Sequence, residues 1–392
     1  MITFCHCRKE RKQTPNIGKI PVKKYPSKFF KDRLISKGRL YRDKILVMKN
    51  LRKNLPIILG VAISAFFLWL ALRGLNLAEV GKVMGGANYI WLVPGVSVYF
   101  IGVWFRSWRW HFLLKPIKNI PTKKMFPILT VGYMGNNIFP ARIGEVLRAV
   151  FLKRREEVPI SASLATIIVE RIFDGVVMLA FVFLNLSELA TLTGDSGFMG
   201  NIQQAAIVGT SVFVGALAVF LLAAMFPKNT SKIGTWFIVK LFPDSLEKKM
   251  LGIMNKFLDG LIALRSPKNV LMVFFTSTII WLFETAKYWF VMHAFDFSVS
   301  FFALMLMNGI VNLATTIPSA PGYVGTFDAP GIAILTAYGI EHVTAAAYTL
   351  VLHAALWLPI TVLGLYYFFL YLSKADMSWK EVFSWQEEVK KV

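Results

Sequence analysis

Apolar segments long enough to cross a lipid bilayer recur along most of the chain, and they constrain its fold more than any other feature. An α-helix of about 20 apolar residues spans the roughly 30 Å of hydrocarbon in a bilayer, where every backbone polar group needs an internal partner. Of the 392 residues, 56% are hydrophobic. We therefore predict an all-α, polytopic membrane protein with about six spanning helices, at about 55–72, 89–114, 159–186, 204–226, 268–294 and 343–372.

Two further apolar stretches, 125–151 and 301–340, are interrupted by proline and glycine. Lys and Arg favour the cytoplasmic side of a membrane. The first stretch is therefore expected to enter and leave the membrane on the cytoplasmic side, and the second on the outer side. This assignment uses the basic segments 115–124 and 152–158, and the segments 187–203 and 295–300, which carry acidic but no basic residues. The two re-entrant hairpins predict an inverted repeat, as in many secondary transporters. The alternative is two ordinary pairs of crossing helices.

Positive charge is concentrated at the amino-terminal end. Residues 1–53 hold 17 Lys and Arg against 3 acidic residues, which accounts for +14 of the net charge of +22. This pattern is typical of a cytoplasmic tail beside an anionic leaflet, and we expect no nucleic-acid partner. An alternative is that the natural start lies at Met48 and that residues 1–47 are an extension without function.

Residues 54–373 are expected to form a transmembrane domain of the plasma membrane, and residues 374–392 a short tail, with both termini on the cytoplasmic side. The segment 227–267 mixes large apolar residues with lysines. This composition predicts an amphipathic helix along the inner membrane surface.

Few residues suit disulfide, metal or enzyme chemistry. The only cysteines, Cys5 and Cys7, lie in the basic tail, so no disulfide framework or cysteine-based metal site is expected. The sequence lacks a phosphate-binding glycine loop followed by Lys-Ser/Thr, Gly-x-Ser-x-Gly and His-Glu-x-x-His. We expect no cleavable signal peptide before the first span. We expect no cofactor and no metal, although a membrane transferase built on carboxylates and arginines stays open.

The first interrupted stretch gathers polar, proline and glycine residues within ten positions: Asn136, Asn137, Pro140, Arg142, Gly144 and Glu145. Proline removes a backbone donor, and a helix that restarts near Ile143 directs free amides and the positive end of its dipole toward the break. Such a tip suits an anionic group, and Arg142 can donate two parallel hydrogen bonds to a phosphate. We predict that this stretch, called the inner hairpin because it enters from the cytoplasmic side, binds an anionic ligand.

The second interrupted stretch repeats this pattern without an arginine. It carries Pro318, Pro321, Gly322, Gly325 and Asp328. A tight turn alone also requires proline and glycine, so this motif is less specific. Broken helices at corresponding places in two halves of a membrane protein nevertheless indicate a transporter's binding site.

Charged residues inside a span are costly and are functional candidates. The densest group is Glu170, Arg171 and Asp174. Glu170 and Asp174 lie four positions apart and share a helix face, whereas Arg171 lies about 100° away and cannot pair with both. We predict Arg142 or Arg148 of the inner hairpin as the partner of this acidic face. The alternative is a salt bridge that only fixes the hairpin to the span.

Other charged residues have simpler interpretations. Glu284 and Lys287, three positions apart, are expected to form an intrahelical pair, with a role in a substrate pathway as the alternative. Arg106 and Arg109 lie among tryptophans and are expected to extend to the lipid headgroups, with a clamp on a lipid phosphate as the alternative. Four histidines are expected to be interfacial or packed: His111, His293, His342 and His353.

The segments Gly132–Arg148 and Ala165–Gly175 resemble the flippase-like family, the transmembrane region of lysylphosphatidylglycerol synthases, which also occurs as stand-alone membrane proteins. The resemblance covers essentially everything after residue 50. The family's inner motif, Pro-x-Arg-x-Gly-Glu, is matched by Pro140, Arg142, Gly144 and Glu145. Its outer motif, Pro-Gly-Gly-x-Gly-x-x-Glu, is matched by Pro321, Gly322 and Gly325, whereas Tyr323 replaces a glycine and Asp328 the glutamate.

The resemblance implies movement of a lipid, or of a lipid-linked sugar or amino-acid conjugate, between leaflets. Only about 20 residues follow the last span, so lysyl transfer, which full-length synthases perform with a further soluble domain, is not expected of this chain alone. We predict a translocase for an anionic lipid or lipid-linked conjugate. Its substrate-binding residues are expected to be Asn136, Asn137, Pro140, Arg142, Gly144, Glu145, Arg148, Glu170, Arg171, Asp174, Pro321, Gly322, Gly325 and Asp328.

In this mechanism Arg142, Arg148 and the backbone amides of the inner hairpin hold a phosphate. The carboxylates gate the site, pair with these arginines or take a proton: Glu145, Glu170 and Asp174, and Asp328 from the outer side. The alternatives are a membrane-embedded glycosyl- or aminoacyl-transferase that uses the same residues, and a scaffold for a partner transferase.

Overall fold

The computed structural model describes residues 60–139, 142–193, 197–317 and 319–374, and all regular structure in these ranges is helical. The predicted all-α class is therefore confirmed for this part of the chain. Contacts divide the chain into two units, Met1–Leu55 and Pro56–Val392, and everything below concerns the second unit.

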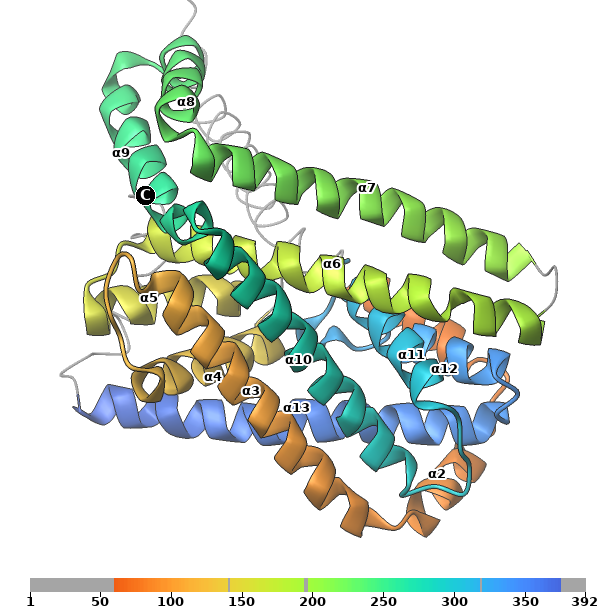
Figure 1. Cartoon of the computed structure of the whole chain (residues 1–392). Helices are drawn as coiled ribbons and strands as arrows, with labels where there is room; N and C mark the ends of the chain where they lie inside the picture. Colours follow the sequence, from red (N-terminus) through yellow and green to blue (C-terminus); the bar gives the residue numbers. More distant parts are fainter. Residues whose placement is uncertain (1–59, 140–141, 194–196, 318, 375–392) are drawn as a thin grey trace, which may run out of the picture. The chain divides into compact units, whose positions relative to one another are not determined.

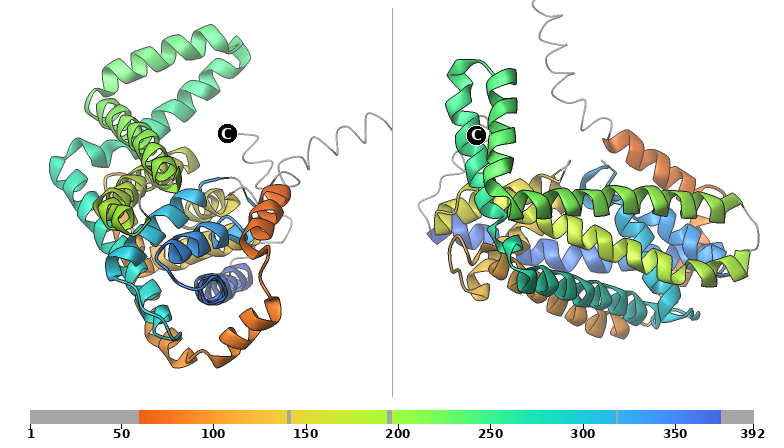
Figure 2. Two further views of the ribbon diagram at one scale, coloured as in Figure 1. Left: turned by 90° about the vertical axis from the view of Figure 1, so that its right-hand side faces the viewer. Right: turned by 45° about the horizontal axis from the view of Figure 1, so that its top comes forward.

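Figure 1 shows the order and arrangement of the helices. After a first helix at Gly60–Leu72, they are α2 (Leu77–Gly86), η1 (Tyr89–Trp91), α3 (Leu92–Leu114), α4 (Thr122–Ile138), α5 (Ile143–Glu156), α6 (Ile160–Thr193), α7 (Gly197–Met225), α8 (Pro227–Leu241), α9 (Asp244–Gly260), η2 (Ile262–Arg265), α10 (Pro267–Met292), α11 (Phe301–Ala314), η3 (Pro321–Tyr323), α12 (Asp328–Ala337) and α13 (His342–Lys374). The most extensive helix–helix packing joins α3 with α10, α4 with α13 and α4 with α5. In Figures 1 and 2, α6 and α7 run side by side and α8 and α9 form a hairpin beyond the end of α7.

Three helical segments among the described residues are long and apolar enough to cross a membrane: Tyr89–Leu114, Pro267–Met292 and His342–Ser373. Two bent helix pairs raise this number to as many as five. They are Gly60–Leu72 with Leu77–Gly86, at 81°, and Val214–Met225 with Pro227–Leu241, at 106°. The protein is thus polytopic, while the count of six spans and the inverted repeat stay predictions.

Two connecting segments differ from the predictions. The single amphipathic helix expected over 227–267 is instead a pair, α8 and α9, which pack against each other. The chain breaks at Pro243 because proline lacks the amide hydrogen that a continuing helix needs. The loop expected at 187–203 is shorter, since α6 continues to Thr193 and α7 begins at Gly197.

The inner interrupted stretch forms a closely packed helical hairpin of α4 and α5. A side chain on Gly144 would collide with the carbonyl oxygen of Gly132 and the backbone nitrogen of Asn136, so only glycine lets the two helices approach this closely. At the other end of the hairpin, Nζ of Lys124 near the start of α4 lies 3.0 Å from Oε1 of Glu156, the last residue of α5. The two ends of the segment therefore meet, which a re-entrant hairpin and a pair of crossing helices both allow.

The outer interrupted stretch is less regular and consists of α11, η3 and α12. Gly322 and Gly325 have φ angles of +73° and +80°, a left-handed conformation that glycine adopts without strain. The backbone nitrogen of Gly325 donates to Oδ2 of Asp328, the first residue of α12, at 2.8 Å, so this carboxylate holds the turn that precedes the helix. Pro318 lies outside the described residues.

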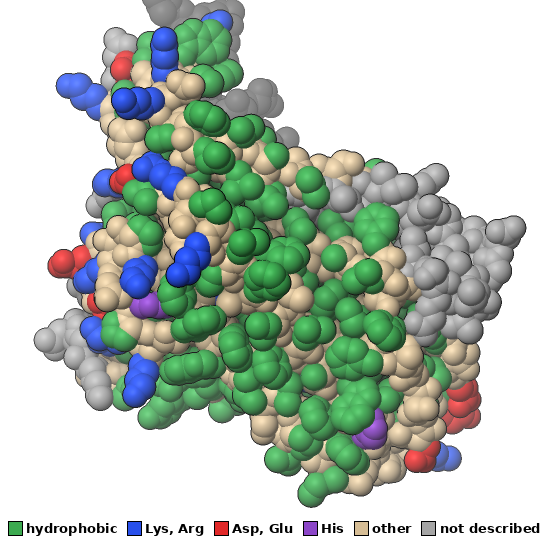
Figure 3. Space-filling view, in the orientation of Figure 1, with side chains coloured by type: hydrophobic (Ala, Val, Ile, Leu, Met, Phe, Trp, Pro, Cys, Tyr) green, Lys and Arg blue, Asp and Glu red, His purple; other side chains and the backbone are tan. Residues whose placement is uncertain are grey.

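Apolar side chains cover much of the surface of the long helices. Phe275 on α10, Leu222 on α7 and Val362 on α13 are 60%, 55% and 57% exposed. Figure 3 shows hydrophobic side chains across the middle of one face and most Lys and Arg side chains gathered at its left end, beside α8 and α9. An apolar band with positive charge at one border is what a bilayer requires of a spanning protein.

Candidate functional site: a charged cavity between the two interrupted stretches

A cavity of about 180 Å³ lies where the inner and outer interrupted stretches meet. Helices α3, α4, α6, α10, α11 and α13 contribute its walls, together with the start of α5 and η3. Seven of the residues predicted from the sequence line it: Asn136, Asn137, Arg142, Glu145, Arg171, Asp174 and Gly322. The two motifs, nearly 180 positions apart in the sequence, therefore face a common space.

The other predicted residues lie behind this lining. Arg148 and Glu170 form a buried pair, and Gly144 packs inside the α4–α5 hairpin. Pro321, Gly325 and Asp328 shape the outer turns rather than the cavity wall. Pro140 lies outside the described residues.

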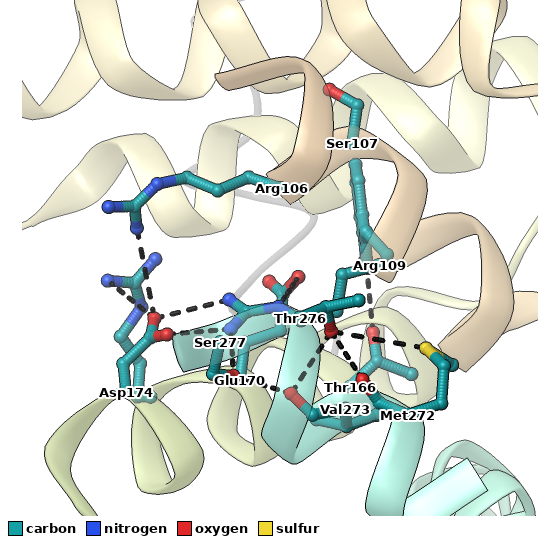
Figure 4. Close-up of polar contacts among 12 residues, drawn as sticks. Arg106, Ser107, Arg109, Thr166, Glu170, Asp174, Met272, Val273, Thr276 and Ser277 are labelled. Atoms are coloured by element: carbon teal, nitrogen blue, oxygen red, sulfur yellow. Dashed lines mark hydrogen bonds and ion pairs between the residues drawn. The ribbon is translucent and has the colours of Figure 1, made fainter. Parts of the chain in front are cut away.

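A buried network of ion pairs closes one side of the cavity. The Asp174 carboxylate accepts two hydrogen bonds from Arg109, at 2.6 and 3.2 Å, and one from the indole of Trp281 at 3.0 Å. The side chains of Arg109 and Asp174 are each 1% exposed. Arg106 adds a longer contact to Asp174 at 3.9 Å, and Figure 4 shows both arginines reaching from α3 toward this carboxylate.

Glu170 occupies the adjacent part of the network. It pairs with Arg148, which confirms one of the two partners predicted for the acidic face, and its Oε1 lies 3.6 Å from Nε of Arg109. The guanidinium group of Arg148 also lies 4.4 Å from the ring centre of Trp110, a cation–π contact. Inner hairpin, α3 and α6 are thus joined by charges that water does not reach.

The position of Arg106 and Arg109 corrects the sequence interpretation. They were expected to extend to the headgroups, but both are buried, because the α3 face that carries them packs on α6 and α10. A signal was present in the sequence: two carboxylates on one face of a span require two cations, and a single arginine of the inner hairpin supplies one. The positions of these arginines within α3 do not reveal that they are buried, because the buried face of α3 depends on which other helices it meets in the folded protein.

Three charged side chains remain accessible from the cavity. Arg142 and Arg171 are each 31% exposed and Glu145 is 23% exposed. The Arg171–Glu145 distance is 3.4 Å and the Arg142–Glu145 distance is 3.9 Å, so neither arginine holds this carboxylate at ideal hydrogen-bond distance.

Arg142 also connects the inner and outer stretches. It has a φ of 54° at the amino end of α5 and donates a hydrogen bond to the carbonyl oxygen of Thr315, which follows α11, at 2.8 Å. Its guanidinium lies 5.7 Å from the ring centre of Tyr323 in η3.

On the α10 side, Lys287 pairs with Glu284, which confirms the predicted intrahelical pair. Arg106 also donates to Glu284 at 2.9 Å. The cavity and the network behind it thus combine six cationic side chains with four carboxylates, an excess of two positive charges in this part of the described chain. They are Arg106, Arg109, Arg142, Arg148, Arg171 and Lys287, and Glu145, Glu170, Asp174 and Glu284.

Opposite this network, His353 of α13 lines the cavity and holds the outer turn. Its Nδ1 lies 2.8 Å from Oδ1 of Asp328, and its Nε2 lies 2.7 Å from the carbonyl oxygen of Gly322. This histidine was expected to be packed or interfacial, and its contact with the outer motif was not predicted. No group of three His, Cys, Asp or Glu that could hold a metal ion occurs within the ranges that the structure describes.

The fold and this site define a polytopic α-helical membrane protein with an interior, positively charged cavity. The model of the lysylphosphatidylglycerol synthase transmembrane region matches residues 57–364, and the chain belongs to this family. The resemblance seen in the two motifs is thereby confirmed.

Several archaeal proteins are similar to the chain. Glycosyltransferase AglD of Haloferax volcanii is 25% identical over 350 residues, which cover 82% of this chain but 55% of that protein, so the chain spans about half of this relative. A UPF0104 membrane protein of Methanocaldococcus jannaschii is 23% identical, with 77% of this chain and 91% of the relative covered. Another UPF0104 membrane protein, from Methanothermobacter thermautotrophicus, is 23% identical, with 75% and 88% covered. No solved structure matches the chain.

Proposed function

We propose that the protein binds the headgroup of an anionic lipid, or of a lipid-linked conjugate, in the cavity and carries it between the leaflets. The observation that supports this most is the excess of positive charge around a cavity inside a membrane protein, with Arg142 and Arg171 still accessible. Buried charges are costly in a membrane unless they are paired, so an unbalanced excess favours a ligand of opposite sign.

Unpaired polar atoms around the same cavity support a ligand with several oxygen atoms. The hydroxyl of Tyr133 and Oδ1 of Asn136 are buried without a hydrogen-bond partner in the described structure. Buried polar atoms normally have partners, and a phosphate with neighbouring hydroxyl groups offers both acceptors and donors.

A second pocket gives the apolar part of a lipid a place beside the headgroup. It measures about 150 Å³, shares Asn136, Arg142 and Tyr323 with the charged cavity, and continues to Phe139, Ile317 and Ala320. Ile317 is exposed at the surface. A headgroup in the cavity could therefore keep its hydrocarbon chain toward the bilayer.

The surroundings of the charged residues separate two roles. Arg142 and Arg171 are accessible, so they are the proposed headgroup ligands, whereas Arg109, Arg148 and their carboxylates hold α3, α5 and α6 together. The proposed set of substrate-binding residues is therefore smaller than the set predicted from the sequence, which also included Arg148 and Glu170.

The test is leaflet exchange of a fluorescent phosphatidylglycerol, and of a fluorescent polyprenyl phosphate, in liposomes that contain the purified protein. Loss of a charge-assisted hydrogen bond costs about 1.5–3 kcal/mol, so Arg142→Gln should slow exchange by about tenfold or more. Arg155→Gln is the control, because Arg155 stacks on Tyr371 outside the cavity. Background exchange of every anionic probe by the wild-type protein contradicts the proposal.

A transferase acting on a lipid is the second candidate, and it is favoured by one observation, the similarity to a protein named as a glycosyltransferase. In that case Glu145 serves as the base and Arg142 holds the phosphate. A covalent lipid product, detected by mass spectrometry after incubation with sugar donors and lost in Glu145→Gln, would establish this function. Exchange without any product favours the translocase.

A further inference from the structure

The contacts of His353 fix the number of protons that its site holds. Both ring nitrogens face acceptors: Nδ1 faces the carboxylate of Asp328, and Nε2 faces the carbonyl oxygen of Gly322. A neutral imidazole has only one N–H, so its other nitrogen would present a lone pair to an oxygen at hydrogen-bond distance. Both contacts are hydrogen bonds only when His353 and Asp328 together carry one proton more than a neutral imidazole and an ionised carboxylate.

That proton can reside on either partner without changing the charge of the pair. An imidazolium beside a carboxylate and a neutral imidazole beside a protonated carboxyl both have a net charge of zero. Loss of the proton leaves a net charge of −1 where His353 and Asp328 are 13% and 1% exposed, and it removes one of the two hydrogen bonds. A charge without a partner at this depth is costly.

The other titratable groups around the cavity do not balance the charge of Asp328 in place of this proton. Those that line the cavity are Tyr99 and Arg106 on α3, Tyr133 on α4, Arg142 and Glu145 of α5 and its cap, Arg171 and Asp174 on α6, Glu284, Lys287 and Tyr288 on α10, and Tyr323 in η3. Each cavity carboxylate among them lies within 4 Å of an arginine or lysine. On α2, which also packs against α13, Glu79 and Lys82 are exposed and lie outside the cavity lining. Asp328, in contrast, has a titratable histidine as its ion-pair partner.

We propose that the protein is a proton-coupled carrier, in which the pair His353–Asp328 binds one proton that crosses the membrane together with one negative charge of the lipid. This inference rests on the proposed function. A deprotonated pair adds a negative charge directly behind the cavity wall and disfavours an anionic headgroup, so proton and anion each strengthen the binding of the other. A monoanionic lipid and one proton together move no net charge.

The same bond links the proton to the shape of the site. Gly322 lines the cavity at a left-handed turn, and its carbonyl oxygen is held by Nε2 of His353. When the proton leaves, the remaining N–H can serve either Asp328 or Gly322 but not both. Release of Gly322 frees the outer turn, which gives a structural route from proton loss to movement of the outer stretch.

The experiment uses liposomes that contain the wild-type protein, a trace of fluorescent phosphatidylglycerol and a pH-sensitive dye inside. One-to-one coupling predicts that a gradient of one pH unit accumulates the lipid about tenfold in the leaflet that faces the less acidic side. Lipid movement should also carry protons into the less acidic compartment. Protein-free liposomes measure the redistribution that needs no protein.

Variants then assign the response to the proposed pair. His353→Gln and, independently, Asp328→Asn should lose the tenfold accumulation, whereas His293→Gln should keep it, because His293 contacts the carbonyl oxygen of Trp289 outside the cavity. Size-exclusion profiles and thermal unfolding check that each variant is folded. Should a variant fail to fold, the wild-type measurement still decides whether coupling exists.

The outcomes separate this inference from the proposed function. Protein-dependent exchange that ignores the gradient and moves no protons overturns the coupling and leaves the translocase standing. Absence of protein-dependent exchange for all anionic probes overturns the translocase and the coupling with it. Accumulation that persists in both His353→Gln and Asp328→Asn overturns the assignment to this pair.

Discussion

Arg109 and Arg142 carry the same charge, yet their surroundings give them different parts in the molecule. Arg109 is surrounded by Asp174, Glu170 and the hydroxyl of Ser277, with no access to water. Arg142 donates to a backbone carbonyl and is one-third exposed. Removing one partner of a buried ion pair leaves an uncompensated charge, whereas removing an accessible charge leaves a group that water can hydrate.

Replacement of these two arginines by glutamine should therefore separate stability from function. Arg109→Gln is expected to lower the free energy of unfolding by about 3–5 kcal/mol, because Asp174 and Glu170 lose their shared cation. Arg142→Gln is expected to change it by less than about 1 kcal/mol while it slows lipid exchange. Thermal unfolding in detergent compares the stability of the two variants with that of the wild type. Equal destabilisation by both variants would contradict the division of roles.

Glu156 should make the base of the inner hairpin sensitive to acid. Burial alone would raise the pKa of Glu156, but hydrogen bonds and charges from Lys124 and Lys118 outweigh burial and lower the pKa below its ordinary value of 4.5. A lowered folded-state pKa contributes stability that is present above the unfolded-state value and is lost as the pH falls through the folded-state value.

The stability difference between the wild type and Glu156→Gln should therefore be constant near pH 7 and shrink only below about pH 4.5. Melting temperatures across a pH series measure it. Glu157→Gln, at an exposed neighbouring residue, should show no such change. A difference that grows on acidification would be inconsistent with the lowered pKa.

The inner hairpin depends on the absence of side chains where α4 and α5 cross. Gly132, Gly135 and Gly144 meet at this crossing, and the carbonyl oxygen and amide that a new side chain would strike belong to the backbone and cannot rotate away. Overpacking of such a contact costs typically 1–3 kcal/mol.

Gly144→Ala should accordingly destabilise the protein by about 1–3 kcal/mol or more and widen the hairpin tip, with loss of lipid exchange. Gly252→Ala in α9 is the matched control. No atom lies within 4 Å of a Cβ at that position, and alanine favours a helix interior by about 0.5–1 kcal/mol over glycine. Thermal unfolding compares the two variants. Equal or higher stability of Gly144→Ala would show that the crossing is looser than described.

The local breaks and turns of the chain could be predicted from the sequence, whereas most contacts between helices could not. The break between α4 and α5 and the turns at Gly322 and Gly325 follow from residue types that act within a few positions. The pair Arg148–Glu170 was found because both residues belong to adjacent segments. Arg109 was missed because Asp174 lies 65 positions away, and helical periodicity does not specify which helix a face meets. His353 was missed although Asp328 lies only 25 positions away on the preceding helix, because a lone histidine in an apolar helix carries no pattern that points to a partner.

The charges at the ends of the helices predict the orientation of the whole membrane domain, and this prediction can be tested directly. Lys123 and Lys153 flank the inner hairpin, and Asp296 and Glu341 flank the outer stretch; all four are exposed. A bilayer places the basic ends on the cytoplasmic side. If both stretches are re-entrant, the two flanks of each stretch lie on one side of the membrane, and the two stretches open to opposite sides.

Single cysteines at these positions, in a chain whose Cys5 and Cys7 are replaced by serine, should react accordingly with a membrane-impermeant maleimide. Cysteines at 296 and 341 are expected to react in intact cells, and those at 123 and 153 only after the membrane is opened. Labelling of all four positions from the same side would contradict the opposite orientation of the two stretches and, with it, the inverted repeat.

Glu145 is a built-in competitor for any anion that enters the cavity. Its carboxylate lies within 4 Å of both Arg142 and Arg171, so an arriving headgroup must displace it from the groups that would bind the ligand. Each new ion pair is then gained at the expense of an old one, which keeps the affinity modest however strong the arginines are alone. A carrier has to release its cargo on the far side, and binding that is favourable enough to enter but weak enough to leave suits that cycle.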